Sequence, residues 1–94
     1  MLQPNFPKEL ILLMQGIRDL GGQAFIVGGA IRDFLLNKDF PKDLDIEVFG
    51  VEISVLENLL SKTGKLSKVG KSFGVLKLKL DDREYDFSLP REEW

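Results

Sequence analysis

The chain has 94 residues, of which 44% are hydrophobic and 30% are charged, and its formal net charge is −2. This composition is typical of a soluble globular protein, and the length allows one domain with a modest core. The sequence contains no cysteine and no histidine. Disulfides, thiol nucleophiles, Ser-His and Cys-His dyads, and zinc or haem sites built on these ligands are therefore excluded. Any chemistry must use carboxylates, lysine, arginine, tyrosine, backbone amides or a hard cation.

The sequence has no uninterrupted apolar run of membrane-spanning length and no signal-peptide pattern at its start, so we expect a cytoplasmic protein. Its charges are unevenly distributed. The charged residues of 81–94 are mostly acidic, whereas the stretch 62–79 contains no acid and carries Lys62, Lys65, Lys68, Lys71, Lys77 and Lys79. Such a cluster is either a surface that attracts phosphate or the solvated face of a strand, and the sequence leaves both interpretations open.

The first predicted element is an amphipathic helix over 7–20. Its apolar residues recur at helical spacing, with Pro7 near its start and Gly21-Gly22 as its end. A short apolar run over 24–27 predicts a buried strand. A short helix is predicted over 30–37, directly after the glycine pair Gly28-Gly29.

The second half of the chain is dominated by predicted strands. Acidic and apolar residues alternate over 43–49, which predicts a strand with Asp43 and Asp45 on one face. A helix over 54–61, an edge strand over 66–69, and two strands over 75–80 and 83–89 joined by a turn at Asp81-Asp82 follow. This order predicts an α+β (mixed α/β) domain in which helices flank a small mixed sheet of about four to five strands.

The glycine pair Gly28-Gly29 is a candidate phosphate site. Glycine lets a ligand approach the backbone, and the following helix would direct its unpaired N–H groups and its positive dipole end to the same place. Arg32, in the first helical turn, could add charge-assisted hydrogen bonds to phosphate. Asp33 is favourable near any helix N-terminus and is explained without a ligand. A glycine pair before a helix is common, so this signal is weak by itself.

Asp43 and Asp45 are candidate metal ligands. Two residues along a strand lie about 6.6 to 6.8 Å apart on one face, so the carboxylates could converge on one cation or bridge two. A solvated strand face would explain the pair if it stood alone, but its position shortly after the glycine turn favours a metal-bound triphosphate. Phosphoryl and nucleotidyl transfer depend mainly on positioning and charge stabilisation, so a chain without histidine can still be such an enzyme.

Four ordered blocks of the sequence resemble a known family. They are VGGAIRDFLLN (27–37), KDLDIEVFG (42–50), VGKSFGV (69–75) and YDFSLPR (85–91). Together they resemble the head domain of bacterial class II tRNA nucleotidyltransferases (CCA-adding enzymes) and poly(A) polymerases, members of the DNA polymerase beta-like nucleotidyltransferase superfamily. The resemblance implies a small mixed sheet flanked by helices, with the metal-binding strand at its centre.

The resemblance also implies roles for individual residues. Asp43 and Asp45 would be catalytic and would ligate two Mg²⁺ ions, and Asp86 would supply a further catalytic carboxylate. The residues implied in nucleotide and phosphate binding are Gly28, Gly29, Arg32, Asp33, Lys71 and Ser72. For Lys71 and Ser72, which could contact the triphosphate or the RNA end, an ordinary polar turn is an equally good explanation.

By this resemblance, residues 1–94 form a single head domain that is incomplete, because the neck, body and tail regions of the family are absent. The parent enzyme would transfer CMP and AMP from CTP and ATP to the 3′ end of tRNA, with Mg²⁺ as cofactor and no membrane partner. We expect the chain to be weak or inactive without a neck and body region in cis or in trans. One alternative is a non-catalytic nucleotide-binding or regulatory module that acts with a partner protein. A superfamily enzyme that modifies a small molecule or a protein ranks last.

Overall fold

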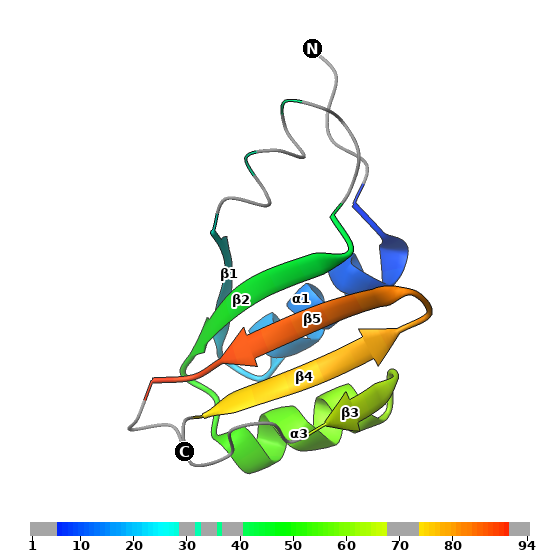
Figure 1. The fold of residues 1–94 in the computed structure, drawn as a ribbon. Coiled ribbons are helices and arrows are strands. Elements are labelled where there is room, and N and C mark those ends of the chain that lie inside the picture. Colours follow the sequence, from blue (N-terminus) through cyan, green and yellow to red (C-terminus); the bar gives the residue numbers. More distant parts are fainter. Residues whose placement is uncertain (1–5, 29–31, 33–35, 37–40, 68–73, 91–94) are drawn as a thin grey trace.

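The computed structural model describes residues 6–28, 32, 36, 41–67 and 74–90. The elements are α1 (Lys8–Asp19), β1 (Gln23–Val27), β2 (Asp43–Phe49), α3 (Ile53–Ser61), β3 (Lys65–Ser67), β4 (Val75–Leu80) and β5 (Arg83–Ser88). The strands form one five-stranded sheet in the order β1-β2-β5-β4-β3, and α1 and α3 both lie on the same face of it (Figure 1). The predicted mixed α/β fold class is confirmed.

The sheet is mixed because one of its four strand pairs is parallel. β2 and β5 run in parallel, whereas the pairs β1–β2, β4–β5 and β3–β4 are antiparallel. A parallel pair needs a long crossover connection, which α3, β3 and β4 provide here. β5 is therefore the central strand, and β2 lies one position from the sheet edge. The expectation that the strand with Asp43 and Asp45 is central is wrong by one position.

Local sequence signals set both ends of α1. The carbonyl of Pro7 accepts hydrogen bonds from the amides of Leu10 and Ile11, at 3.1 and 3.2 Å. At the other end Gly21 adopts a φ of 88°, and the amide of Gly22 donates to the carbonyl of Ile17 at 3.0 Å. This glycine-based ending satisfies a helix carbonyl that would otherwise lack a partner, as the sequence predicts.

The core lies between the helices and one face of the sheet. Every second residue of β2, β4 and β5 points into it and meets the apolar faces of α1 and α3. No polar or charged residue of the described ranges is buried. The core residues are Leu10, Leu13, Ile17, Leu44, Ile46, Val48, Val51, Ile53, Leu56, Leu60, Leu76, Leu78, Tyr85, Phe87 and Leu89. The alternation leaves the polar side chains of these strands on the opposite face, which we call the open face.

β1 differs from its prediction as a buried strand. None of its five residues is buried, and the Phe25 side chain is 49% exposed. The reason is that β1 lies at the sheet edge, so it pairs with β2 alone. Ala24 and Ile26 pack against the core, whereas Phe25 lies on the open face and contacts Phe49 edge to face, with ring centroids 5.8 Å apart.

The remaining predicted elements agree with the structure where it describes them. The predicted edge strand is present as β3, and the turn at Asp81-Asp82 joins β4 to β5, with Asp81 at a φ of 54°. Of the predicted helix over 30–37, only Arg32 and Leu36 are described, and both are helical. In the described ranges, neither helix has the length and hydropathy that crossing a membrane would require.

Candidate active site

The strand β2 presents Asp43 and Asp45 on the open face. Leu44 and Ile46 alternate with them and are at most 2% exposed, so the hydrophobic core determines which face the two aspartates occupy. A slip of one residue would bury both carboxylates and expose the apolar side chains, so the register of β2 is strongly specified. Both aspartates are exposed and accessible to a ligand.

β5 brings a third carboxylate to the same place. Tyr85 and Phe87 are fully buried, and Asp86 between them therefore lies on the open face. In the parallel register, Asp86 is opposite Asp45. Adjacent strands are about 4.7 to 4.9 Å apart, so these two residues are immediate neighbours although they are far apart in the sequence.

The glycine turn that follows β1 lies next to the same carboxylates. Val27, the last residue of β1, is opposite Asp45 in the antiparallel register. Gly28 follows with a φ of 94°, a conformation that residues with a side chain rarely adopt. A Cβ atom at this position would lie 3.7 Å from Oδ2 of Asp45. The glycine turn and the aspartate strand are thus in contact distance, and the absence of a side chain leaves the space beside Asp45 open.

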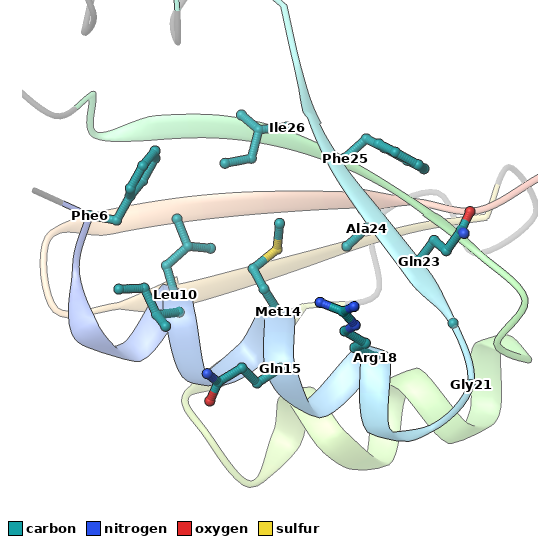
Figure 2. Close-up of a pocket in the computed structure, with 12 residues that line it drawn as sticks. Phe6, Leu10, Met14, Gln15, Arg18, Gly21, Gln23, Ala24, Phe25 and Ile26 are labelled. Atoms are coloured by element: carbon teal, nitrogen blue, oxygen red, sulfur yellow. The ribbon is translucent and has the colours of Figure 1, made fainter. Parts of the chain in front are cut away.

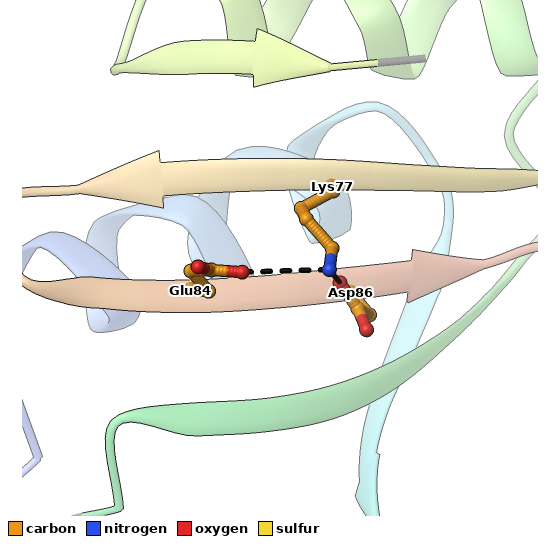
Figure 3. Close-up of polar contacts among 3 residues, drawn as sticks. All are labelled: Lys77, Glu84 and Asp86. Atoms are coloured by element: carbon orange, nitrogen blue, oxygen red, sulfur yellow. Dashed lines mark ion pairs between the residues drawn. The ribbon is translucent and has the colours of Figure 1, made fainter. Parts of the chain in front are cut away.

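A lysine from β4 neutralises part of this acidic cluster. Lys77 is opposite Asp86, and its Nζ lies 3.4 Å from Oε1 of Glu84 and 3.8 Å from Oδ1 of Asp86 (Figure 3). The nearby Asp86 carboxylate is the main reason that the pKa of Lys77 is raised, and the hydrogen bond with Glu84 adds to the effect. Lys77 therefore stays protonated beside the carboxylates.

Asp86 is the most perturbed acid of the cluster. Its Oδ1 atom is buried and has no hydrogen-bond partner among the described residues. Burial raises the pKa of Asp86, Lys77 opposes this shift, and the negative charge of Asp45 reinforces it. The site thus contains a carboxylate whose charged form is only partly stabilised by the protein.

The chemistry of these residues suits an ion that is shared with a ligand. In the described part of the chain, no group of three or more acidic side chains could hold a metal ion. The described residues therefore do not form a metal site from protein ligands alone. Mg²⁺, however, is usually bound through one or two carboxylates together with substrate phosphates. Asp43 and Asp45, with the open space at Gly28, match that second arrangement.

The other predicted site residues are only partly described. Arg32 is helical and exposed, and Gly29, Asp33, Lys71 and Ser72 lie outside the described ranges. The sequence interpretation missed the contacts of Lys77 with Glu84 and Asp86. The sequence did contain a signal for these contacts. A two-residue turn at 81–82 places residue 80 opposite residue 83, and each step back along β4 matches one step forward along β5, so residue 77 lies opposite residue 86.

A separate apolar groove of about 620 Å³ lies between α1 and β1 (Figure 2). Phe6, Leu10 and Met14 point into it from the helix side, and Ala24 and Ile26 line it from β1. None of the carboxylates belongs to this groove. The groove and the acidic cluster are therefore distinct features.

Comparison with known proteins gives one family match and several similar structures. A model of the poly(A) polymerase head domain matches residues 24–93. A CCA-adding enzyme in complex with ATP has a TM-score of 0.74 and 29% identity, covering 94% of this chain and 22% of that enzyme. The Thermotoga maritima CCA-adding enzyme complexed with tRNA has a TM-score of 0.72 and 28% identity, and the match covers 96% of this chain and 23% of that enzyme. The Bacillus stearothermophilus CCA-adding enzyme in complex with CTP has a TM-score of 0.67 and 25% identity, and the match covers 93% of this chain and 20% of that enzyme.

The chain thus spans between a fifth and a quarter of the length of these solved enzymes. No curated protein sequence matches it.

Proposed function

Since the chain belongs to the poly(A) polymerase head-domain family, we propose that its open face binds a magnesium nucleoside triphosphate and that it serves as the catalytic head of a tRNA nucleotidyltransferase. The substrates would be CTP and ATP, and CMP and AMP would be transferred to an RNA 3′ end. The solved structures of similar enzymes contain CTP, ATP or tRNA, which supports this choice of substrates. The chain alone would be weak or inactive.

The observation that carries the proposal is the contact between two motifs that are separate in the sequence. Gly28 leaves open the space 3.7 Å from Oδ2 of Asp45, and Asp86 is opposite Asp45 on the neighbouring strand. A triphosphate approaching the backbone at Gly28 would lie directly against the carboxylate that holds its cation. Neither motif alone would provide both contacts.

Each residue has a defined task in the proposed reaction. Asp43 and Asp45 would hold the cations, Gly28 and Gly29 would admit the triphosphate to the backbone, and Arg32 would add positive charge. Asp33, Lys71 and Ser72 are proposed as supporting phosphate contacts, and Asp86 as an additional carboxylate. Bound Mg²⁺ would favour deprotonation of the attacking 3′-hydroxyl and stabilise the leaving pyrophosphate. The protein itself contributes orientation and electrostatic stabilisation.

Calorimetric titration tests this proposal. We expect CTP and ATP to bind the native chain in the presence of Mg²⁺ and not in EDTA. In D43A/D45A, binding should weaken by at least about 100-fold, or roughly 2.7 kcal/mol, because a phosphate-bound cation loses its protein ligands.

The matched control is E47A/E52A, which also removes two exposed acidic side chains. Glu47 lies on the same face of β2 but farther from Gly28, and Glu52 precedes α3. This variant should bind like the native chain. Equal affinity of native and D43A/D45A protein would contradict the metal-triphosphate hypothesis.

A further inference from the structure

Two rows of side chains cross the open face, and the charge of the side chains changes from negative to positive along each row. In both rows, β2 and β5 contribute acids, whereas β4 and β3 contribute lysine or a neutral residue. The first row is Asp45, Asp86, Lys77 and Ser67, and the second is Asp43, Glu84, Lys79 and Lys65. The open face is therefore acidic on β2 and β5 and becomes basic on β4 and β3.

The positive charge of Lys79 is not neutralised by the acid directly opposite it. Glu84 faces Lys79 in the register but forms its ion pair with Lys77, the diagonal neighbour (Figure 3). Lys65 is opposite Lys79 on the other side, and both lysines are exposed. Among the described residues, no acid lies within ion-pair distance of either lysine.

Two lysines directly opposite each other destabilise a sheet, so their pairing requires an explanation. Lysine on an edge strand prevents unwanted strand pairing, which could account for Lys65 on β3. That explanation does not apply to Lys79, because β4 is paired on both sides. The unpaired charge on an interior strand therefore points to an anionic ligand.

We propose that Lys65 and Lys79 bind the phosphate backbone of the RNA strand whose 3′ end lies at Asp43 and Asp45. This inference rests on the proposed function and deepens it. In nucleotidyl transfer the attacking and leaving oxygens are roughly in line, on opposite sides of the reacting phosphorus. Gly28 and β1 place the triphosphate on one flank of Asp45, so the attacking strand must arrive from the other flank, where β5, β4 and β3 lie. On that flank, Lys79 and Lys65 provide the charge that attracts an RNA backbone.

The distances across the sheet agree with this path. β4 and β3 lie one and two strand spacings from β5, or about 5 and 10 Å. Across the sheet, Lys79 thus lies on the same strand as Lys77, and Lys65 lies one strand spacing farther from the reacting centre. Phosphates upstream of the 3′ end can meet them while the terminal hydroxyl remains at the carboxylates.

The salt dependence of RNA binding provides the test. A short single-stranded RNA with a free 3′-hydroxyl is titrated with the protein at fixed Mg²⁺ and several salt concentrations. Each phosphate contact contributes about −0.7 to the slope of log K against log salt, so K65Q/K79Q should make the slope less steep by about 1.4, and K79Q alone by about 0.7. The control K8Q/K62Q also removes two exposed lysines, one at the start of α1 and one after α3, and its slope should equal the native slope.

The outcomes separate this inference from the function on which it rests. Calorimetric binding of Mg-CTP should be unchanged in K65Q/K79Q, because neither lysine is adjacent to Gly28 or Asp45. The inference is overturned if native protein does not bind the RNA, or if K65Q/K79Q and K8Q/K62Q change the slope equally. Failure of the native chain to bind Mg-CTP would instead overturn the proposed function, whatever the RNA titration shows.

Discussion

At the scale of single residues, Asp86 is held where its charged form is poorly stabilised. Tyr85 and Phe87 hold it on the open face, and one of its carboxylate oxygens is buried without a hydrogen-bond partner among the described residues. Lys77 compensates only in part, because burial and the charge of Asp45 outweigh its effect on the pKa of Asp86. The charged form of Asp86 therefore lowers the stability of the fold.

The raised pKa of Asp86 predicts a pH-dependent effect of D86N on stability. Because the folded state binds this proton more tightly than the unfolded state, the contribution of Asp86 to stability is present at low pH and is lost as pH rises through its pKa. The D86N side chain stays neutral. The Tm of D86N minus that of the native chain should therefore increase between about pH 3 and pH 7.

Thermal melts in EDTA measure this difference without bound cations. D82N, which makes the same change in the exposed turn between β4 and β5, serves as the control and should show a smaller trend. A difference for D86N that shrinks as pH rises would show that the ion pair with Lys77 outweighs the cost of burial.

At the scale of elements, the connection from α1 to β1 positions the glycine turn. Gly22 packs against Val51 and against the carbonyl oxygen of Phe49, which a Cβ atom would approach to 2.9 Å. This close approach starts β1 at the level of Phe49, so that Val27 is opposite Asp45 at the other end of the strand. A tight contact at one end of β1 thus sets the position of Gly28 at the other.

The variant G22A should therefore be much less stable than G21A. An added methyl group at Gly22 meets backbone and side chain, at a cost of about 3 kcal/mol. At Gly21, a Cβ atom would meet nothing within 4 Å, and the positive φ alone costs about 1 kcal/mol. Urea denaturation would measure the loss in free energy of unfolding for both variants, provided that their m-values equal that of the native chain. Equal losses in the two variants would show that close packing at Gly22 is not what places β1.

At the scale of the whole molecule, the two-layer fold separates the hydrophobic core from the polar face of the sheet. Both helices cover one face of the sheet (Figure 1). The burial alternation along β2, β4 and β5 places the polar residues of these strands on the other face. The open face can therefore carry a cluster of acids next to lysines without disturbing the core. The chain also spans only between a fifth and a quarter of the solved enzymes that it resembles.

This proportion predicts that catalysis will require more than these residues. We expect the chain alone to incorporate little or no labelled CMP or AMP into tRNA ends. A chimera in which it replaces the matching segment of the Thermotoga maritima enzyme should incorporate nucleotide, and the D43A/D45A chimera should lose at least about 1,000-fold in rate, or roughly 4 kcal/mol of transition-state stabilisation. Efficient CCA addition by the chain alone would contradict the prediction. A native chimera that binds Mg-CTP but stays inactive would favour the regulatory alternative.

Much of the fold could be predicted from local patterns. Leu10, Leu13 and Ile17 recur at helical spacing, and buried and exposed residues alternate along β2. Both patterns are visible in the sequence because burial in the core requires an apolar residue at each of these positions. The prediction that β1 is buried failed for a physical reason: an apolar run of four residues looks the same on an edge strand as on an interior strand. Position in the sheet depends on partners that the run itself does not encode.

The sequence by itself determined the two halves of the candidate site and the face on which Asp43 and Asp45 lie, because alternation with buried residues is a local property. It also determined the mixed fold class. The turn at 81–82 carries a signal for the pairing of Lys77 with Asp86, which the sequence interpretation did not use. Only the tertiary structure decided that β5 lies parallel to β2, that Asp86 stands beside Asp45, and that Gly28 reaches the same carboxylate. These neighbours depend on a crossover through α3, β3 and β4, and such long-range contacts leave no periodic pattern in the chain.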